Sequence, residues 1–147
     1  MDMTPEEYQN YVKQKAKKSP LVKDLLLAFL IGGAICVVGQ AIMNAWSAAG
    51  LNKEDAGTAT SCTLVLLSAL LTGLNLYNKV ARFGGAGTLV PITGFANAVV
   101  SPAIDFKSEN WCNGVGAKMF TIAGPVIVYG VTASVIYGII LVLLQSF

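Results

Sequence analysis

The chain has 147 residues, of which 54% are hydrophobic and 12% are charged, and its formal net charge is +2 at pH 7. Soluble domains carry roughly a quarter of their residues as charged side chains, so this composition excludes an ordinary soluble domain. We therefore predict an all-α fold, a polytopic membrane helix bundle. The prediction rests on four stretches without Asp, Glu, Lys or Arg, each reaching the roughly 20 residues that a helix needs to cross a bilayer: residues 25–52, 56–78, 83–104 and 119–147.

Residues 1–24 are predicted to form a basic amphipathic segment ahead of a single membrane domain at residues 25–147. The run T-P-E-E from Thr4 to Glu7 is a capping box, which predicts a helix over residues 4–18. Such a helix suits the lipid headgroup region. Basic residues are enriched on the cytoplasmic side of membrane proteins, so the lysines before the first span predict a cytoplasmic N-terminus. These are Lys13, Lys15, Lys17, Lys18 and Lys23.

Within the membrane domain, spans are expected at residues 25–46, 59–77 and 119–144. The uncharged segment at residues 83–104 either crosses the membrane or enters it and turns back. If it turns back, nine of the ten Lys and Arg residues lie on the inner side, and if it crosses, seven do. The positive-inside rule therefore favours re-entry, with crossing as the alternative.

Residues 83–104 read FGGAGTLVPITGFANAVVSPAI, an apolar stretch with many residues that interrupt helices. Irregular backbone at membrane depth is tolerated only inside protein or along a water-filled cavity. We therefore predict a discontinuous helix that borders a solute path, where the N–H groups of a half-helix face an anion. The alternative is a glycine-rich kink that serves helix packing alone. The residues expected along the path are Gly84, Gly85, Gly87, Pro91, Thr93 and Asn97, with Gln40 of the first span facing them.

Other site chemistries are disfavoured by what the sequence lacks. It contains no histidine, no C-x-x-C spacing and no pair of carboxylates within a span. We therefore expect no enzyme, no catalytic residue, no metal site and no cofactor. The three cysteines, Cys36, Cys62 and Cys112, are expected to be small, buried, reduced thiols.

The distribution of charge bears on the kind of transport. The spans contain no acidic or basic side chain, which favours a passive channel over a proton-coupled carrier. Lys79, Arg82 and Lys118 flank the spans and are expected to form a basic rim that attracts anions. Solvated flanking charge is the alternative explanation for these three residues. No nucleic-acid partner is expected.

Four segments together resemble the SpoVA family of endospore-forming bacteria, in particular its AC-type members. They are AFLIGGAICVVGQ, LLSALLTGLNLYNKV, FGGAGTLVPITGFAN and AGPVIVYG. The resemblance covers about residues 20–144, and the related AE proteins share the pattern G-A-G-x-x-V-P-I-T. The chain departs from the family at Asn78, where an acid is usual, and at Gly84, where alanine is usual.

The resemblance implies a channel subunit in the forespore and spore inner membrane. It would move dipicolinic acid, with calcium, into the forespore during sporulation and out during germination, with gating by membrane tension. The implied partners are other SpoVA proteins, particularly an AE-type membrane subunit and the soluble AD protein, in a homo- or hetero-oligomer. The alternatives are a non-conducting scaffold subunit of the same complex and a proton-coupled carrier.

Overall fold

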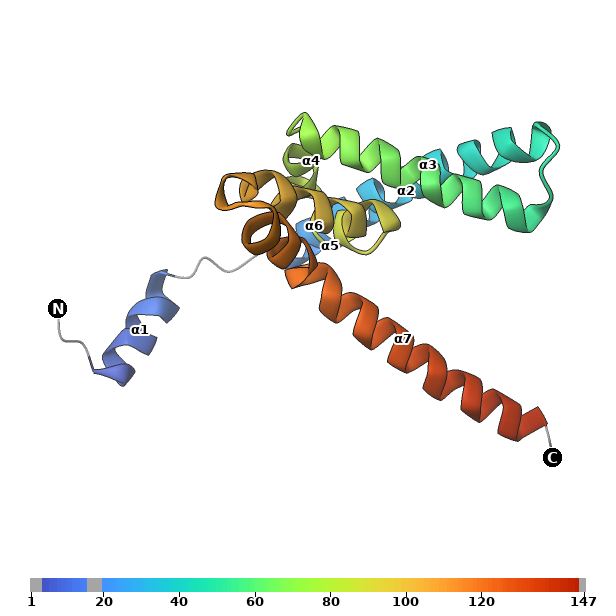
Figure 1. Cartoon of the computed structure of the whole chain (residues 1–147). Coiled ribbons are helices and arrows are strands. Elements are labelled where there is room, and N and C mark those ends of the chain that lie inside the picture. Colours follow the sequence, from blue (N-terminus) through green and yellow to red (C-terminus); the bar gives the residue numbers. More distant parts are fainter. Residues whose placement is uncertain (1–3, 16–19, 146–147) are drawn as a thin grey trace.

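The computed structural model describes residues 4–15 and 20–145, and these are helical without a strand (Figure 1). The prediction of an all-α membrane fold is confirmed, because three helices are long and apolar enough to cross a membrane: Leu21–Ala48, Lys53–Gly73 and Trp111–Gln145. In chain order the elements are α1 Pro5–Lys15, α2 Leu21–Ala48, α3 Lys53–Gly73, α4 Tyr77–Gly84, α5 Ala86–Leu89, α6 Ile92–Asp105, η1 Lys107–Glu109, η2 Trp111–Gly116 and α7 Ala117–Gln145.

Helix α1 begins with the predicted capping box. The backbone N–H of Thr4 donates to Glu7 Oε2 at 2.9 Å, and the N–H of Glu7 donates to Thr4 Oγ1 at 3.3 Å. The hydrogen bond from the Thr4 backbone, helped by the Thr4 hydroxyl, holds the pKa of Glu7 below its usual value. The helix ends at Lys15, and the predicted continuation to residue 18, which includes Lys17 and Lys18, lies outside the described residues. Figure 1 shows α1 apart from the other helices.

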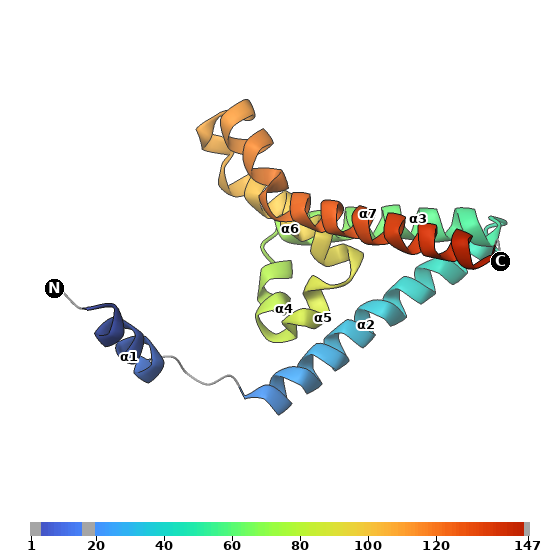
Figure 2. The ribbon, with the colours of Figure 1, turned by 90° about the horizontal axis from the view of Figure 1, so that it is seen from below.

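Helices α2 and α3 form a hairpin, and each begins before the predicted span, α2 at Leu21 rather than residue 25 and α3 at Lys53 rather than residue 59. Asn52 caps α3, since its side chain accepts a hydrogen bond from the backbone N–H of Asp55 at 2.8 Å. Because the helix starts at this cap, the charged residues 53–55 form its first turn. The carboxylates of Glu54 and Asp55 lie there at the positive end of the helix dipole. Close to the connection between the two helices, Trp46 Nε1 of α2 donates a hydrogen bond to Thr63 Oγ1 of α3 at 3.2 Å. Figure 2 shows the two helices diverging from this connection.

The segment after α3 is a discontinuous helix, as the sequence predicts. The first break is at Gly85, between α4 and α5, where φ is +46°, a conformation that favours glycine. The second break lies between α5 and α6, where Pro91 is extended with ψ of 161°. Figure 2 shows α4 and α5 between the diverging helices α2 and α3.

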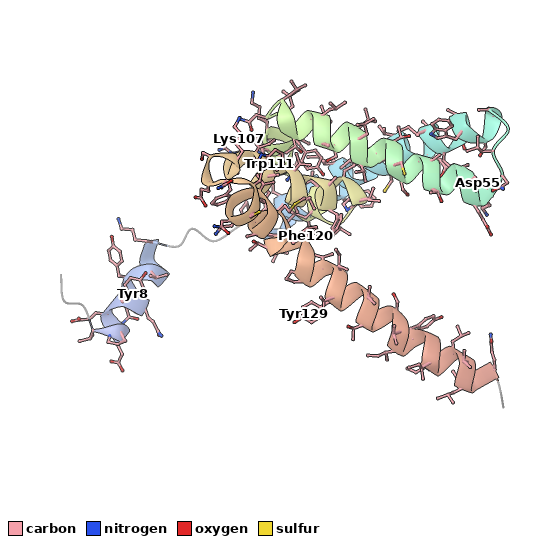
Figure 3. All side chains as sticks on the ribbon, viewed as in Figure 1. Tyr8, Asp55, Lys107, Trp111, Phe120 and Tyr129 are labelled. Atoms are coloured by element: carbon pink, nitrogen blue, oxygen red, sulfur yellow. The ribbon has the colours of Figure 1, made fainter. Side chains whose placement is uncertain are left out.

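The last part of the broken segment, α6, runs parallel to α3. The Ser68 hydroxyl donates to the carbonyl of Thr93 at 2.6 Å. One turn later, the single proton of the Thr72 hydroxyl is shared between the carbonyl oxygen of Ser68 at 2.7 Å and Asn97 Oδ1 at 2.9 Å. The chain therefore leaves the broken segment at the end of the bundle where α3 ends. Figure 3 likewise shows Lys107, just after α6, at the opposite end from Asp55. This arrangement favours re-entry over crossing, and the position of residues 83–104 in the membrane stays a prediction.

Helix α7 extends away from the bundle. It packs on α6 and η2 near its start, where Ala123 is fully buried. Beyond Gly124 its side chains are almost all exposed in the single chain, including Tyr129, which is 76% exposed (Figure 3). Pro125 lies inside this helix without ending it. A large apolar surface of α7 is thus left for lipid or for another subunit.

Candidate solute path at the broken helix

A network of hydroxyl groups lies where α4, α5 and α6 meet α3. Tyr77 Oη donates to the carbonyl of Thr88 at 2.8 Å and lies 3.0 Å from Thr93 Oγ1. The carbonyl oxygen of Thr93 accepts a hydrogen bond from the Ser68 hydroxyl. All four residues are buried, with exposed fractions of 6% or less. The network joins the two sides of the break at Pro91 and holds the broken segment on α3.

Asn97 continues this polar line by one turn of α6. Its Oδ1 lies 2.9 Å from the Thr72 hydroxyl, whose proton it shares with the carbonyl of Ser68. Its amide nitrogen forms no hydrogen bond within the described residues. Asn97 is half-buried, and none of the fully buried side-chain nitrogen or oxygen atoms in the described part of the chain lacks a partner. The free amide of Asn97 is therefore the group of this site that remains able to contact a solute.

The glycines of the broken segment, which are the predicted path residues Gly84, Gly85 and Gly87 together with Gly94, fall into two groups. Gly87 lies against the backbone of α2, where a Cβ atom would overlap the carbonyl oxygen of Ala28. A Cβ on Gly94 would overlap the carbonyl oxygens of Thr88 and Leu89, and one on Gly84 would meet the Thr88 methyl at 2.5 Å. A Cβ on Gly85 would meet nothing within 4 Å. Close packing thus accounts for the glycines in α4, α5 and α6, as the packing alternative anticipates.

Gln40 lies on α2 and is exposed. Its Nε2 donates to Asn44 Oδ1 at 2.9 Å, one turn further along the same helix, so the two amides pair with each other. No hydrogen bond between described residues joins Gln40 to Thr93 or Asn97. Its predicted place opposite the broken segment stays a prediction, and a single chain does not bring these amides together.

The three residues of the predicted basic rim separate into two places. Lys79 and Arg82, both exposed on α4, line a hollow of about 450 Å³ together with Asn75, Asn78 and Phe83. Lys118 lies at the start of α7, where its Nζ is 5.0 Å from the centre of the Phe106 ring. The hollow on α4 is thus lined by two cationic side chains and two amides, a combination that suits an anion. Lys118 is not among the residues that line this hollow.

The three cysteines differ from expectation in their surroundings. Cys36, Cys62 and Cys112 are free thiols, as predicted, but all three are exposed in the single chain, so the prediction that they are buried is wrong. They lie on sides of α2, α3 and η2 that no other described residue covers in the single chain. Among the described residues no group of three His, Cys, Asp or Glu side chains is placed to hold a metal ion.

Ser68, Tyr77 and Thr88 of the hydroxyl network, together with Thr72, are not among the residues predicted to line the path. Ser68 and Thr72 lie four residues apart and therefore share one face of α3, and this signal was available in the sequence. Tyr77 and Thr88 carried no such signal, because their contacts depend on how the chain turns back after Gly85.

Comparison with known proteins supplies the family. Residues 24–140 match the family model described as SpoVAC/SpoVAEB sporulation membrane protein. The chain is also 46% identical over 136 residues to Stage V sporulation protein AC of Bacillus subtilis (strain 168), which covers 92% of this chain and 91% of that protein. No solved structure matches the chain. From the family model and this relative, we conclude that the chain belongs to the SpoVAC/SpoVAEB family of sporulation membrane proteins.

Proposed function

We propose that the chain is a channel subunit that moves dipicolinic acid, with calcium, across the inner membrane of the forespore and spore. Its solute path runs beside the broken helix, and membrane tension opens it. The N-terminal lysines lie on the cytoplasmic side. The chain works without enzymatic chemistry.

The observation that carries this proposal is the interrupted helix with a free amide beside it. The two breaks, at Gly85 and Pro91, lie between α2 and α3, two helices long enough to span a membrane. Asn97 lies in the second turn of α6, six residues after Pro91, and its amide nitrogen forms no hydrogen bond within the described residues. Dipicolinate is a small, flat dianion, and uncharged donors can pass such an ion without holding it too tightly to leave.

A single chain does not enclose a path. Most of α7 lacks neighbours, and the hydroxyl network is internally satisfied. The conducting unit is therefore an oligomer, formed with other SpoVA proteins such as an AE-type membrane subunit and the soluble AD protein. In that assembly Gln40, Gly85 and the basic pair of α4 line the route that one chain leaves open.

Release of dipicolinate from liposomes tests the role of Asn97. Asn97→Leu keeps the size of the side chain and removes its donor, so release is expected to slow about ten-fold, the effect of losing one hydrogen bond to a charged group. Asn113→Leu makes the same exchange on the exposed surface of η2 and serves as the control. Protease protection shows that each variant is inserted.

A third variant separates solute contact from structural support. Thr72→Val removes the hydrogen bond to Asn97 Oδ1 but keeps the amide of Asn97. If the amide contacts the solute, Thr72→Val slows release less than Asn97→Leu does. Equal losses in the two variants would remove Asn97 from the path and assign it a packing role.

A scaffold subunit is the second candidate, and the tight packing of Gly84, Gly87 and Gly94 favours it. In that case the small residues serve helix contacts alone, and the solute passes through another subunit. Recording of single channels from the purified chain distinguishes the two functions. A bilayer that stays sealed at every tension supports the scaffold, and opening under tension supports the channel.

A further inference from the structure

A cavity lies between α2 and α3, beside the hydroxyl network, and Asn97 is not among its lining residues. It has a volume of about 450 Å³, within the roughly 300–1,000 Å³ of small-molecule sites. Its walls are aliphatic side chains of α2 between Leu30 and Val38, of α3 between Leu64 and Leu71, and Val80 of α4. Both wall helices are long and apolar enough to span a membrane, so lipid tails surround this cavity.

Among the described residues that line this cavity, the polar side chains are hydroxyls that already have partners. Ser68 donates to the carbonyl of Thr93, and Tyr77 donates to the carbonyl of Thr88. The Thr93 hydroxyl lies 3.0 Å from Tyr77 Oη. A polar solute that entered would lose its hydration without gaining a hydrogen bond, which is costly. The occupant that suits these walls is a hydrocarbon chain.

The cavity adjoins a basic surface through α4. Val80 lines the cavity, while Lys79 and Arg82 line the polar hollow on the other side of the same short helix. No acid lines that hollow. Asp24 shares a neighbouring hollow with Arg82, but within the described part of the chain the two form no salt bridge. Two unpaired cations therefore lie next to an apolar cavity, at the end of the bundle where α3 ends.

We propose that this region binds one anionic phospholipid, with an acyl chain in the cavity and the phosphate of its headgroup against Lys79 and Arg82. The charge of the hollow selects an anionic headgroup, and the amides of Asn75 and Asn78 add donors for phosphate oxygens. Basic pockets beside membrane helices are a general form of lipid headgroup site. Lys79, Arg82 and Thr93 also belong to the proposed solute path, but the lipid proposal is tested by binding alone, so its failure would leave the transport proposal standing.

Binding of phosphatidylglycerol and phosphatidylcholine to the purified full chain, followed by native mass spectrometry, tests the headgroup. One tightly held phosphatidylglycerol per chain is expected, in preference to phosphatidylcholine. Each basic residue near an anionic headgroup contributes roughly a five-fold change in affinity, so a K79Q/R82Q double variant is expected to lose about 25-fold. A K53Q/K107Q variant loses the same charge outside the hollow and is expected to keep the preference. Equal binding of the two lipids, or equal losses in the two variants, overturns the headgroup site.

Phosphatidylglycerol with a photoreactive acyl chain tests the cavity. Crosslinks are expected on α2 at residues 30–38 and on α3 at residues 64–71. Ala34→Phe fills the cavity and is expected to abolish them, whereas Cys36→Phe adds the same ring on the opposite face of α2 and is expected to preserve them. Crosslinks spread over α7, or crosslinks between chains at Ala34, overturn the proposal, because they indicate unselective lipid contact or a helix of a second chain in the cavity.

Discussion

Replacing Gly87 by alanine is expected to weaken the packing of α5 on α2. The added methyl would overlap the carbonyl oxygen of Ala28 and would lie 2.8 Å from its carbonyl carbon and 3.0 Å from its Cα, whereas ordinary contacts begin at 3.4 Å. The obstacle is backbone inside a helix, which cannot rotate away as a side chain can. Helix α5 must therefore withdraw, and overpacking of this kind costs about 1–3 kcal/mol.

The effect is measured by unfolding the purified chain in mixed micelles with increasing SDS. Gly33→Ala is the matched control, because a Cβ at Gly33 meets nothing within 4 Å. Alanine favours a helix over glycine by up to about 1 kcal/mol, so Gly33→Ala is expected to be neutral or slightly stabilising. The two variants add the same methyl group and differ only in what it meets.

If Gly87→Ala and Gly33→Ala unfold at the same SDS concentration, the close approach of α5 and α2 is refuted. The two variants also bear on the proposed path. If Gly87→Ala loses stability and dipicolinate release together, the glycine acts through packing. If it keeps its stability and loses release, the glycine borders the solute.

Three further predictions follow from the structure. Gly85→Ala places a side chain at φ of +46° and is expected to cost about 1–2 kcal/mol in the same SDS unfolding measurement, although the site has open space. Tyr77→Phe leaves a buried carbonyl without its donor and is expected to cost about 1–3 kcal/mol, whereas Tyr137→Phe on the exposed part of α7 is expected to have no measurable effect. The pKa of Glu7 is lowered in the folded helix, so its cap stabilises α1 fully above the ordinary value of 4.5 and is lost as the pH falls through the lowered pKa. An NMR titration of Glu7 measures this, and Thr4→Ala is expected to return the pKa toward its ordinary value.

Local features of the fold could be read from the sequence. The capping box at Thr4 and the breaks at Gly85 and Pro91 depend on a few neighbouring residues, and the structure has all of them. The long helices followed from the segregation of charge. Their starts did not, because the first turns of α2 and α3 admit charged residues, and the cap at Asn52 fixes where α3 begins.

Features that depend on distant contacts could not be read in this way. Ser68 bonds to Thr93 and Thr72 to Asn97 across 25 residues of chain, and no local pattern indicates the parallel course of α3 and α6 that these bonds require. The role of a glycine has the same limit. Gly85 and Gly87 look alike in sequence, yet one adopts a positive φ in open space and the other lies against a neighbouring helix.

The interior of this chain is built from small and hydroxyl-bearing residues, and the largest fully buried side chains among the described residues are Thr88 and Ser68. Nearly all of the bulky aliphatic and aromatic side chains therefore meet the surrounding medium. The surrounding detergent or bilayer therefore contributes to the stability of the folded chain, and a measured free energy of unfolding applies to the protein in that particular medium. Subunits extracted one at a time will differ in stability from the same subunits purified as an assembled complex.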